Sequence, residues 1–294
     1  MHLINIKDLS FDDINKILNR AKFFKDNKWQ TILKNKSLAL LFFEPSTRTR
    51  LSFELAAKQL GMSVLNMDME KSSLLKGEAV HDTLQTIEAM GVDGIIMRCG
   101  QQEMIDNVSE KIKTPIINAG AGTRSHPSQA LLDAFTILQH KQDLTDLKMA
   151  IVGDIKHSRV AHSNIDLLTK LGAKSIHLVG PKELLPEPAI NNTQCYTDFD
   201  QGIADADVVM LLRMQKERMQ ETIIHDFQSY HQHYGLKESD LKFLKKDTLI
   251  LHPGPMNRGI EISDAIAEGP QSVILEQVKN GVFVRMAILE HCLA

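Results

Sequence analysis

The sequence predicts an α/β protein with two domains, each a mostly parallel sheet flanked by helices, and a C-terminal helix packing back on the first domain. The chain has 294 residues, and domains usually span about 100 to 200 residues, which favours two. Short apolar runs alternate with segments of helical periodicity, a pattern typical of parallel strands joined by crossover helices. We expect a boundary near residue 140, dividing the chain into 1–140 and 141–294, with the returning helix at about 271–293.

The first half is expected to open with an amphipathic helix. Ser10 followed by Asp13 is a capping-box pattern, and apolar residues at helical spacing continue from Ile14 to Phe24. Gly61 and Gly91 lie where helices should end before the next strand, in the left-handed conformation of a C-terminal cap. Strands are expected at 38–44, 64–67, 94–97 and 115–118.

The second half repeats this alternation. Pro127 suits the first position of a helix, which the charged residues 141–143 end. Strands are expected at 149–154, 176–179, 208–212 and 248–251, before the final amphipathic run. The sequence therefore predicts a second α/β domain.

Composition excludes several classes of protein. With 43% hydrophobic residues and a net charge of -3, the chain resembles ordinary globular proteins. The pI near 6.5 argues against a nucleic acid partner, which needs a concentrated positive surface. Charges interrupt every apolar stretch before membrane-spanning length, so no membrane partner is expected. The cysteines are odd in number and lack a CxxC pair, which favours reduced thiols: Cys99, Cys195 and Cys292. The N-terminus lacks a basic start followed by a long apolar run, so we expect a cytoplasmic location.

Neither a metal nor an organic cofactor is expected. Gly153 follows an apolar run, but the G-x-G-x-x-G fingerprint of a dinucleotide site is absent. The pairs His157 with His162 and His231 with His233 have spacings that metals sometimes use, yet no carboxylate or cysteine cluster accompanies them.

Hydroxyls and cations follow the first predicted strand, directly before a helical run. Free backbone N–H groups and the helix dipole favour an anion there, and arginine adds donors matched to phosphate oxygens. The sequence therefore predicts a phosphate site, the alternative being a capped surface turn with solvated arginines. Its residues are Ser46, Thr47, Arg48 and Thr49.

Three further segments carry polar groups that can contact a ligand. Ser72 and Lys76 lie in a polar loop, which is either a mobile cation-bearing loop or a solvated one. Arg98 ends a predicted strand, where open α/β sheets place ligand contacts, or it is an exposed strand end. His126 and Gln129 begin a helix and can donate to a polarised carbonyl, or the histidine is a structural cap.

These motifs resemble, in order, those of the transcarbamylase family, and the resemblance covers essentially the whole chain. In the first half it lies in Phe-Phe-Glu-Pro-Ser-Thr-Arg-Thr-Arg at 42–50, Lys-Gly-Glu at 76–78 and His-Pro-Ser-Gln at 126–129. In the second half it lies in 153–159, Arg-Met-Gln-Lys-Glu-Arg at 213–218, His-Pro-Gly-Pro at 252–255 and 280–287. The second-half motifs resemble those of the aspartate-using members. The Ser-Met-Gly and His-Cys-Leu-Pro motifs of the ornithine-using members are not intact here.

The resemblance implies transfer of a carbamoyl group from carbamoyl phosphate to the α-amine of L-aspartate, the committed step of pyrimidine (UMP) biosynthesis. It implies catalytic roles for Arg48, Thr49, Lys76, Arg98 and His126. The carbamoyl phosphate site would comprise Ser46, Thr47, Arg48, Thr49, Ser72, Lys76, Arg98, His126 and Gln129. Aspartate would be bound by Lys76, Arg159, Arg213, Gln215, Pro253 and Gly254. Physical logic agrees, because a dicarboxylate needs cations and arginine binds carboxylates in bidentate fashion.

The family resemblance also implies a homotrimer, in which the loop with Ser72 and Lys76 reaches a neighbouring subunit's site. It leaves two further partners open, a regulatory chain and a dihydroorotase. Ala121, Ser128 and Gly254 depart from the family pattern and put the loop before His126 and the acceptor site in question. Two competing hypotheses are a transcarbamylase for another amine, such as ornithine, and a non-catalytic member that binds ligand or acts as a scaffold.

Overall fold

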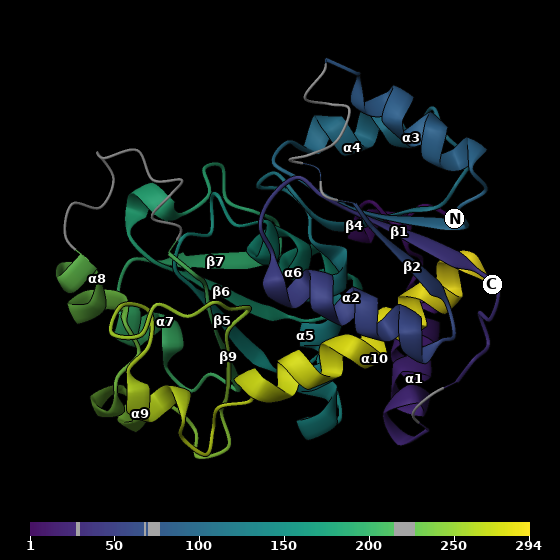
Figure 1. Ribbon diagram of the computed structural model, residues 1–294. Helices are drawn as coiled ribbons and strands as arrows, with labels where there is room; N and C mark the ends of the chain where they lie inside the picture. The colour runs from purple at the N-terminus through teal and green to yellow at the C-terminus, as the bar shows by residue number, and fades with distance from the viewer. Residues whose placement is uncertain (28–29, 68, 70–76, 215–226) are drawn as a thin grey trace. The chain divides into compact units, whose positions relative to one another are not determined.

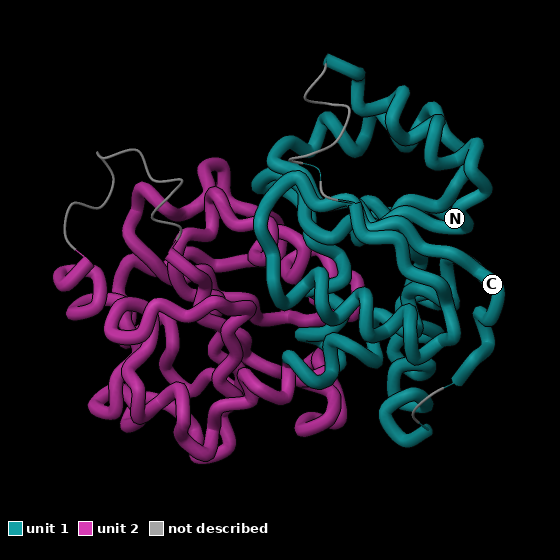
Figure 2. The backbone as a smooth tube through the Cα atoms, viewed as in Figure 1, with its two compact units in different colours: residues 1–135, 278–294 teal, residues 136–277 magenta. Residues whose placement is uncertain are grey.

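The computed structural model describes residues 1–27, 30–67, 69, 77–214 and 227–294. The chain divides into two compact units, unit 1 (residues 1–135 and 278–294) and unit 2 (residues 136–277), coloured separately in Figure 2. It passes between the units within two helices, α5 (Pro127–His140) and α10 (Ile274–Leu293). Unit 2 is thus one continuous segment, whereas unit 1 is assembled from two. No helix in the described part of the chain is long and apolar enough to cross a membrane.

Unit 1 is built on a four-stranded parallel sheet in the order β2-β1-β3-β4 (Figure 1). The strands are β1 (Ser37–Phe42), β2 (Ser63–Met67), β3 (Gly94–Cys99) and β4 (Ile116–Ala121). All four strands expected in the first half are therefore present. The first ends at Phe42 rather than at Glu44, and β4 continues through the residues expected to form a loop, where Ala121 pairs with Ser125.

Helices cover both faces of this sheet. They are η1 (Ile6–Asp8), α1 (Phe11–Asp26), α2 (Thr47–Gln59), α3 (Val80–Ala89), α4 (Gln102–Ser109) and the first part of α5. In Figure 1, α3 and α4 lie on one face and α2 on the other. Ser10 caps α1 by accepting a 3.1 Å hydrogen bond from the Asp13 N–H, as predicted. Gly61 and Gly91 adopt φ of 84° and 81°, so the predicted left-handed helix ends are confirmed.

The returning C-terminal helix is also confirmed. Helix α10 begins at Ile274, slightly after the expected start, and its residues from Val278 onward belong to unit 1. Its apolar side is buried there, and Arg20 of α1 forms an ion pair with Glu290. Residues from the end of the chain thus complete the first unit.

Unit 2 is built on a five-stranded parallel sheet in the order β7-β6-β5-β8-β9. Its strands are β5 (Lys148–Val152), β6 (Ser175–Val179), β7 (Thr193–Tyr196), β8 (Val208–Leu211) and β9 (Leu249–Leu251). Its other elements are α6 (Arg159–Lys170), η4 (Lys182–Leu184), α7 (Phe199–Ile203), α8 (Phe227–Tyr234), η5 (Glu238–Phe243) and α9 (Asp264–Ala267). Strand β7 was not predicted, because this short edge strand has no fully buried residue and carries no apolar run.

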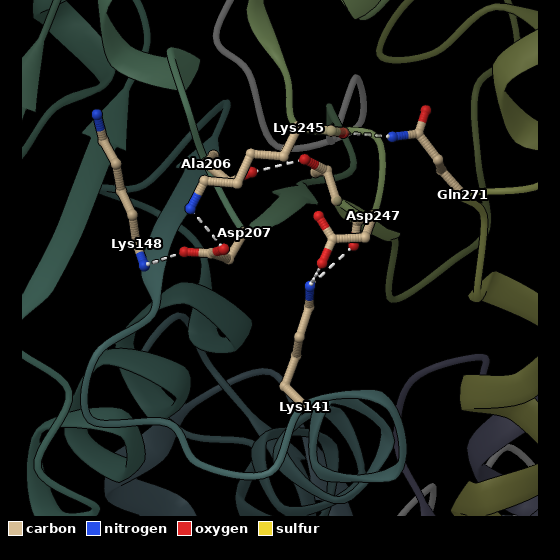
Figure 3. A network of polar contacts seen from close by, with 8 residues as sticks. Lys141, Lys148, Ala206, Asp207, Lys245, Asp247 and Gln271 are labelled. Carbon is tan, nitrogen blue, oxygen red and sulfur yellow. Dashed lines mark hydrogen bonds and ion pairs between the residues drawn. The ribbon is translucent and has the colours of Figure 1, made fainter.

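Polar contacts hold together the amino ends of three neighbouring strands in unit 2 (Figure 3). The Lys148 N–H of β5 donates to the Asp207 carboxylate at 2.9 Å, and the Asp207 N–H donates back to the Lys148 carbonyl. The Lys245 ammonium also binds Asp207, at 2.6 Å. Nearby, Lys141 binds Asp247 at 2.6 Å, just before β9. These contacts fix the sheet at the amino ends of its strands. The carboxyl ends of the same strands therefore remain available for other groups.

Candidate functional site

In each unit, candidate residues follow the two strands between which the sheet order reverses. The chain proceeds from β1 outward to β2 and returns to β3 on the other side of β1; it does the same at β5, β6 and β8. In open α/β sheets ligands bind at the carboxyl ends of strands at such a switch point. Ser46 follows β1 and Arg98 lies near the end of β3 in unit 1, while Arg159 follows β5 and Arg213 follows β8 in unit 2. Each unit therefore has its own set of polar groups at the position expected for a ligand.

The predicted phosphate segment forms the first turn of α2. Ser46 is the N-cap residue in an extended conformation, and its side chain makes no capping hydrogen bond. Thr47 and Arg48 are exposed, whereas Thr49 is buried. The segment contains no acidic side chain in its first helical turn. Its hydroxyls, guanidinium and backbone N–H groups therefore give a positive, donor-rich helix start suited to an anion.

Arg98 is held between two neighbouring strands. Its Nη1 donates to the Ala119 carbonyl of β4 at 3.3 Å, and its Nε lies 3.6 Å from a carboxylate oxygen of Glu44. The side chain is 13% exposed. Such fixation reduces the freedom that the arginine would lose on binding a ligand.

His126 and Gln129 begin α5 and are both buried. The preceding turn is closed by the Ala121 N–H, which donates to the Ser125 carbonyl at 2.9 Å. Ala121 is thus accommodated as the last residue of a strand. Ser128 is fully buried, and within the described residues its hydroxyl has no hydrogen-bond partner. The Gln129 amide nitrogen donates to Asp133, 2.9 Å away.

Unit 2 places two arginines at the carboxyl ends of adjacent strands. Arg159 begins α6 and is buried, with Ser158 as an N-cap that accepts from the Ala161 N–H at 3.2 Å. Arg213 is partly exposed and lies two residues beyond β8. Two guanidinium groups in segments that follow neighbouring strands suit a ligand with more than one carboxylate.

A buried carboxylate connects the ends of β8 and β9. Glu261, 1% exposed, accepts from the backbone N–H groups of Met214 and Asn257, each at 2.7 Å. It also accepts from the Asn257 side chain at 2.7 Å and lies 3.6 Å from the buried His252. One side chain therefore fixes the segment containing Arg213 against the turn that follows β9.

The turn after β9 depends on glycine. Gly254 has a φ of +63°, a left-handed conformation that glycine adopts without steric cost. Its N–H donates to His252 Nδ1 at 2.8 Å, while the His252 N–H donates to the Gln277 side chain at 2.9 Å. Pro253 and Gly254 are partly exposed. Gly254, which departs from the family pattern, thus suits the left-handed backbone of this turn.

Three candidate residues lie outside the described residues: Ser72, Lys76 and Gln215. In the described part of the chain, no group of three or more acidic, histidine or cysteine side chains is arranged to hold a metal ion.

Sequence reasoning missed the buried charged residues that support the site. Asp133, Glu261 and Arg285 are at most 3% exposed, yet each lies within or beside an apolar run. A charged residue at a position that periodicity assigns to the core is the signal that could have identified them, because charges are rarely buried without a partner.

Comparison with known proteins agrees with this geometry in both units. Residues 1–139 match a family model described as "Aspartate/ornithine carbamoyltransferase, carbamoyl-P binding domain", and residues 145–292 match the "Asp/Orn binding domain" of that family. The chain belongs to the aspartate/ornithine carbamoyltransferase family.

Relatives within this carbamoyltransferase family resemble the chain over nearly its full length. It is 45% identical to an aspartate carbamoyltransferase catalytic subunit of Dehalococcoides mccartyi, covering 99% of this chain and 91% of that protein. It is 44% identical to the catalytic subunit of Legionella pneumophila, covering 100% and 99%.

Solved structures of the family share the fold. An aspartate transcarbamoylase of Trypanosoma cruzi, in complex with carbamoyl aspartate and phosphate, matches with a TM-score of 0.89 and 29% identity, covering 100% and 96% of the two chains. An ornithine carbamoyltransferase of Pyrococcus furiosus matches with a TM-score of 0.89 and 28% identity, covering 99% and 96%. The fold therefore does not distinguish an aspartate acceptor from an ornithine acceptor. The residues on the acceptor side must make that distinction.

Proposed function

We propose that this chain is an aspartate carbamoyltransferase, which transfers the carbamoyl group of carbamoyl phosphate to the α-amine of L-aspartate. The products are N-carbamoyl-L-aspartate and phosphate, in the committed step of pyrimidine (UMP) biosynthesis. The observation that carries this proposal is the pair of cationic sets at the two switch points. A donor-rich helix start lies in unit 1, and two arginines on adjacent strand ends lie in unit 2.

In unit 1, the phosphate oxygens are bound by the first turn of α2 and by Arg48. Negative charge develops on the carbamoyl oxygen as the amine attacks the carbonyl carbon. Thr49, Arg98 and His126 donate to that oxygen, as preorganised donors do in acyl-transfer sites. Gln129 binds the carbamoyl amide. Burial of Thr49, His126 and Gln129 strengthens these interactions by excluding water.

The reaction itself needs little covalent chemistry from the protein. The aspartate amine attacks as the neutral base, the bond from the carbamoyl carbon to the phosphate oxygen breaks, and the departing phosphate takes the amine proton. Holding two reactants in line supplies much of the acceleration. The fixed position of Arg98 between Ala119 and Glu44 contributes to that preorganisation.

On the acceptor side, Arg159 and Arg213 bind the two carboxylates of aspartate, and Gln215, Pro253 and Gly254 complete the set of aspartate-binding residues. Ornithine is the alternative acceptor, and its side-chain amine would meet repulsion from these guanidinium groups. The relatives at 44–46% identity named as aspartate carbamoyltransferase catalytic subunits also favour aspartate.

We also propose that the chain acts as a homotrimer in the cytoplasm, with Ser72 and Lys76 contributed to a neighbouring subunit's site. Exposed leucines in unit 1 support self-association, because Leu51 and Leu55 of α2 and Leu65 of edge strand β2 are 59%, 42% and 50% exposed. Mixing Lys76→Ala chains with Arg48→Ala chains should then restore part of the activity, whereas independent sites would restore none. A regulatory chain and a dihydroorotase are the further partners to test by co-purification.

The deciding experiment is phosphate release from carbamoyl phosphate by the purified protein, with L-aspartate and L-ornithine compared. We expect turnover with aspartate and carbamoyl aspartate by mass spectrometry. Turnover with ornithine alone would refute the acceptor assignment. Tight carbamoyl phosphate binding without turnover on either amine would favour the non-catalytic alternative.

A further inference from the structure

A buried carboxylate lies directly behind Gln129. Asp133 is one helical turn further along α5, is fully buried, and accepts the Gln129 amide nitrogen at 2.9 Å. Residues four apart on a helix lie on the same face, so the contact is built into α5 itself. A buried carboxylate so close to the ligand end of the helix is costly unless its charge is compensated.

Arg285 of α10 carries a positive charge that interacts electrostatically with Asp133 and so compensates part of this cost. Its side chain is 3% exposed; burial lowers the pKa of the guanidinium to about 10, and the negative charge of Asp133 opposes this shift. The guanidinium carbon lies 5.0 Å from the ring centroid of Phe53, and Nη1 donates to the Gly281 carbonyl at 3.1 Å. Phe53 is one turn beyond Thr49 in α2, just as Asp133 is one turn beyond Gln129 in α5. Arg285 therefore supports both helices whose first turns form the proposed carbamoyl phosphate site.

The charge of Asp133 determines which end of the Gln129 amide faces it. An ionised carboxylate has no proton to donate, so it can pair only with the NH₂ end of an amide. The Gln129 carbonyl oxygen, Oε1, is then left at the other end as an acceptor. An acceptor recognises an N–H group such as the carbamoyl NH₂, but not a methyl group in the same place.

We propose that Asp133, with Arg285 beside it, is a positioning residue that fixes the Gln129 amide with Oε1 toward the carbamoyl NH₂. It thereby makes the site select carbamoyl phosphate over acyl phosphates that carry a methyl group. This inference rests on the proposed function.

The test is the variant Asp133→Asn, assayed with L-aspartate. The positive charge of Arg285 favours the introduced amide with its oxygen on that side and its NH₂ toward Gln129, so the Gln129 amide reverses. We expect kcat/KM for carbamoyl phosphate to fall about tenfold, the value of one hydrogen bond. The inhibition constants of acetyl phosphate and of inorganic phosphate should stay within about twofold, since neither uses an N–H contact to Gln129. Equal weakening of all three ligands would overturn the proposal.

A matched control exists in the same unit. Gln102 and Asp106 on α4 form the same contact at the same spacing, with Nε2 to Oδ1 at 2.9 Å. Asp106→Asn should leave the selectivity for carbamoyl phosphate unchanged. A change like that of Asp133→Asn would assign the effect to general loss of helix support and count against the proposal.

A double-variant cycle separates positioning from a structural role. In a Gln129→Ala background, Asp133→Asn should add less than about a twofold change in kcat/KM, because no amide remains to be oriented. The same tenfold loss in both backgrounds would overturn the proposal.

If Asp133→Asn alone does not fold, the double variant Asp133→Asn with Arg285→Met removes both charges together. This double variant then takes the place of Asp133→Asn in the cycle. Failure of both to fold would assign the pair to stability instead.

Wild-type activity distinguishes failure of the proposed function from failure of the Asp133 proposal. If the wild-type chain shows no aspartate-dependent turnover, the proposed function fails. If it turns over and Asp133→Asn retains wild-type selectivity, only this inference fails.

Discussion

The carboxylate of Glu261 accepts a 2.7 Å hydrogen bond from the backbone N–H of Met214, the residue directly after Arg213. The same carboxylate binds the backbone and side chain of Asn257, in the turn after β9. The position of a proposed substrate-binding arginine is therefore fixed by a side chain that makes no proposed contact with substrate.

Glu261→Gln is expected to raise the KM for aspartate about tenfold and to lower stability by roughly 1–3 kcal/mol, because an NH₂ group then faces backbone donors. Steady-state kinetics and thermal unfolding measure both effects. Glu268→Gln is the control, since Glu268 is exposed and binds Arg258 at the surface. An unchanged KM in Glu261→Gln would show that the Glu261 contacts do not position Arg213.

Arg159→Lys is expected to raise the KM for aspartate by roughly 10- to 100-fold, because a lysine cannot replace bidentate, charge-assisted hydrogen bonds. The KM for carbamoyl phosphate should change far less, since the residues proposed to bind its phosphate belong to unit 1. Aspartate saturation curves provide the measurement, with Arg258→Lys as a surface control. Equal effects on both substrates would argue against a direct carboxylate contact.

His126→Ala is expected to lower kcat about 100-fold, the scale known for loss of one oxyanion donor. The inhibition constant of inorganic phosphate should be nearly unchanged, because His126 is proposed to contact the carbamoyl oxygen. His140→Ala, which removes an exposed partner of Glu276, should retain wild-type turnover. Wild-type kcat in His126→Ala would contradict the proposed oxyanion role.

Acid should destabilise unit 2 through His177. Burial lowers the pKa of His177 below its ordinary value of 6.5, against the opposing effect of a hydrogen bond to the Gly202 carbonyl. The folded state thus binds fewer protons than the unfolded state just below pH 6.5, and stability rises with pH there. The stabilisation is present above pH 6.5 and is lost as pH falls toward the folded-state pKa.

Denaturant unfolding between pH 7 and pH 5 tests this sign. His177→Gln should flatten the slope of unfolding free energy against pH, while the exposed His233→Gln should leave it unchanged. A slope as steep in His177→Gln as in the wild type would remove His177 from the acid response.

Local patterns in the sequence predict most of the fold, because strands buried on both faces appear as uninterrupted apolar runs and helices show their caps. Strand β7 is the exception, since its four residues Thr193–Tyr196 lie at a sheet edge and include no apolar run. The phosphate segment is also predictable, because its hydroxyls and arginines are contiguous. The supporting interactions cannot be predicted in this way. Asp133 interacts with Arg285, and Met214 with Glu261, only when distant segments of the chain are packed together.

The discontinuity of unit 1 has a consequence for the order in which the chain is made. A ribosome releases all of unit 2 before residues 278–294 emerge, so the second sheet can fold while the first still lacks part of its core. Arg285 lies in this segment and arrives only after the whole of unit 2. The carbamoyl phosphate half, although encoded first, is therefore finished last, and a nascent chain interrupted near residue 277 would hold a complete second sheet and an unfinished first one.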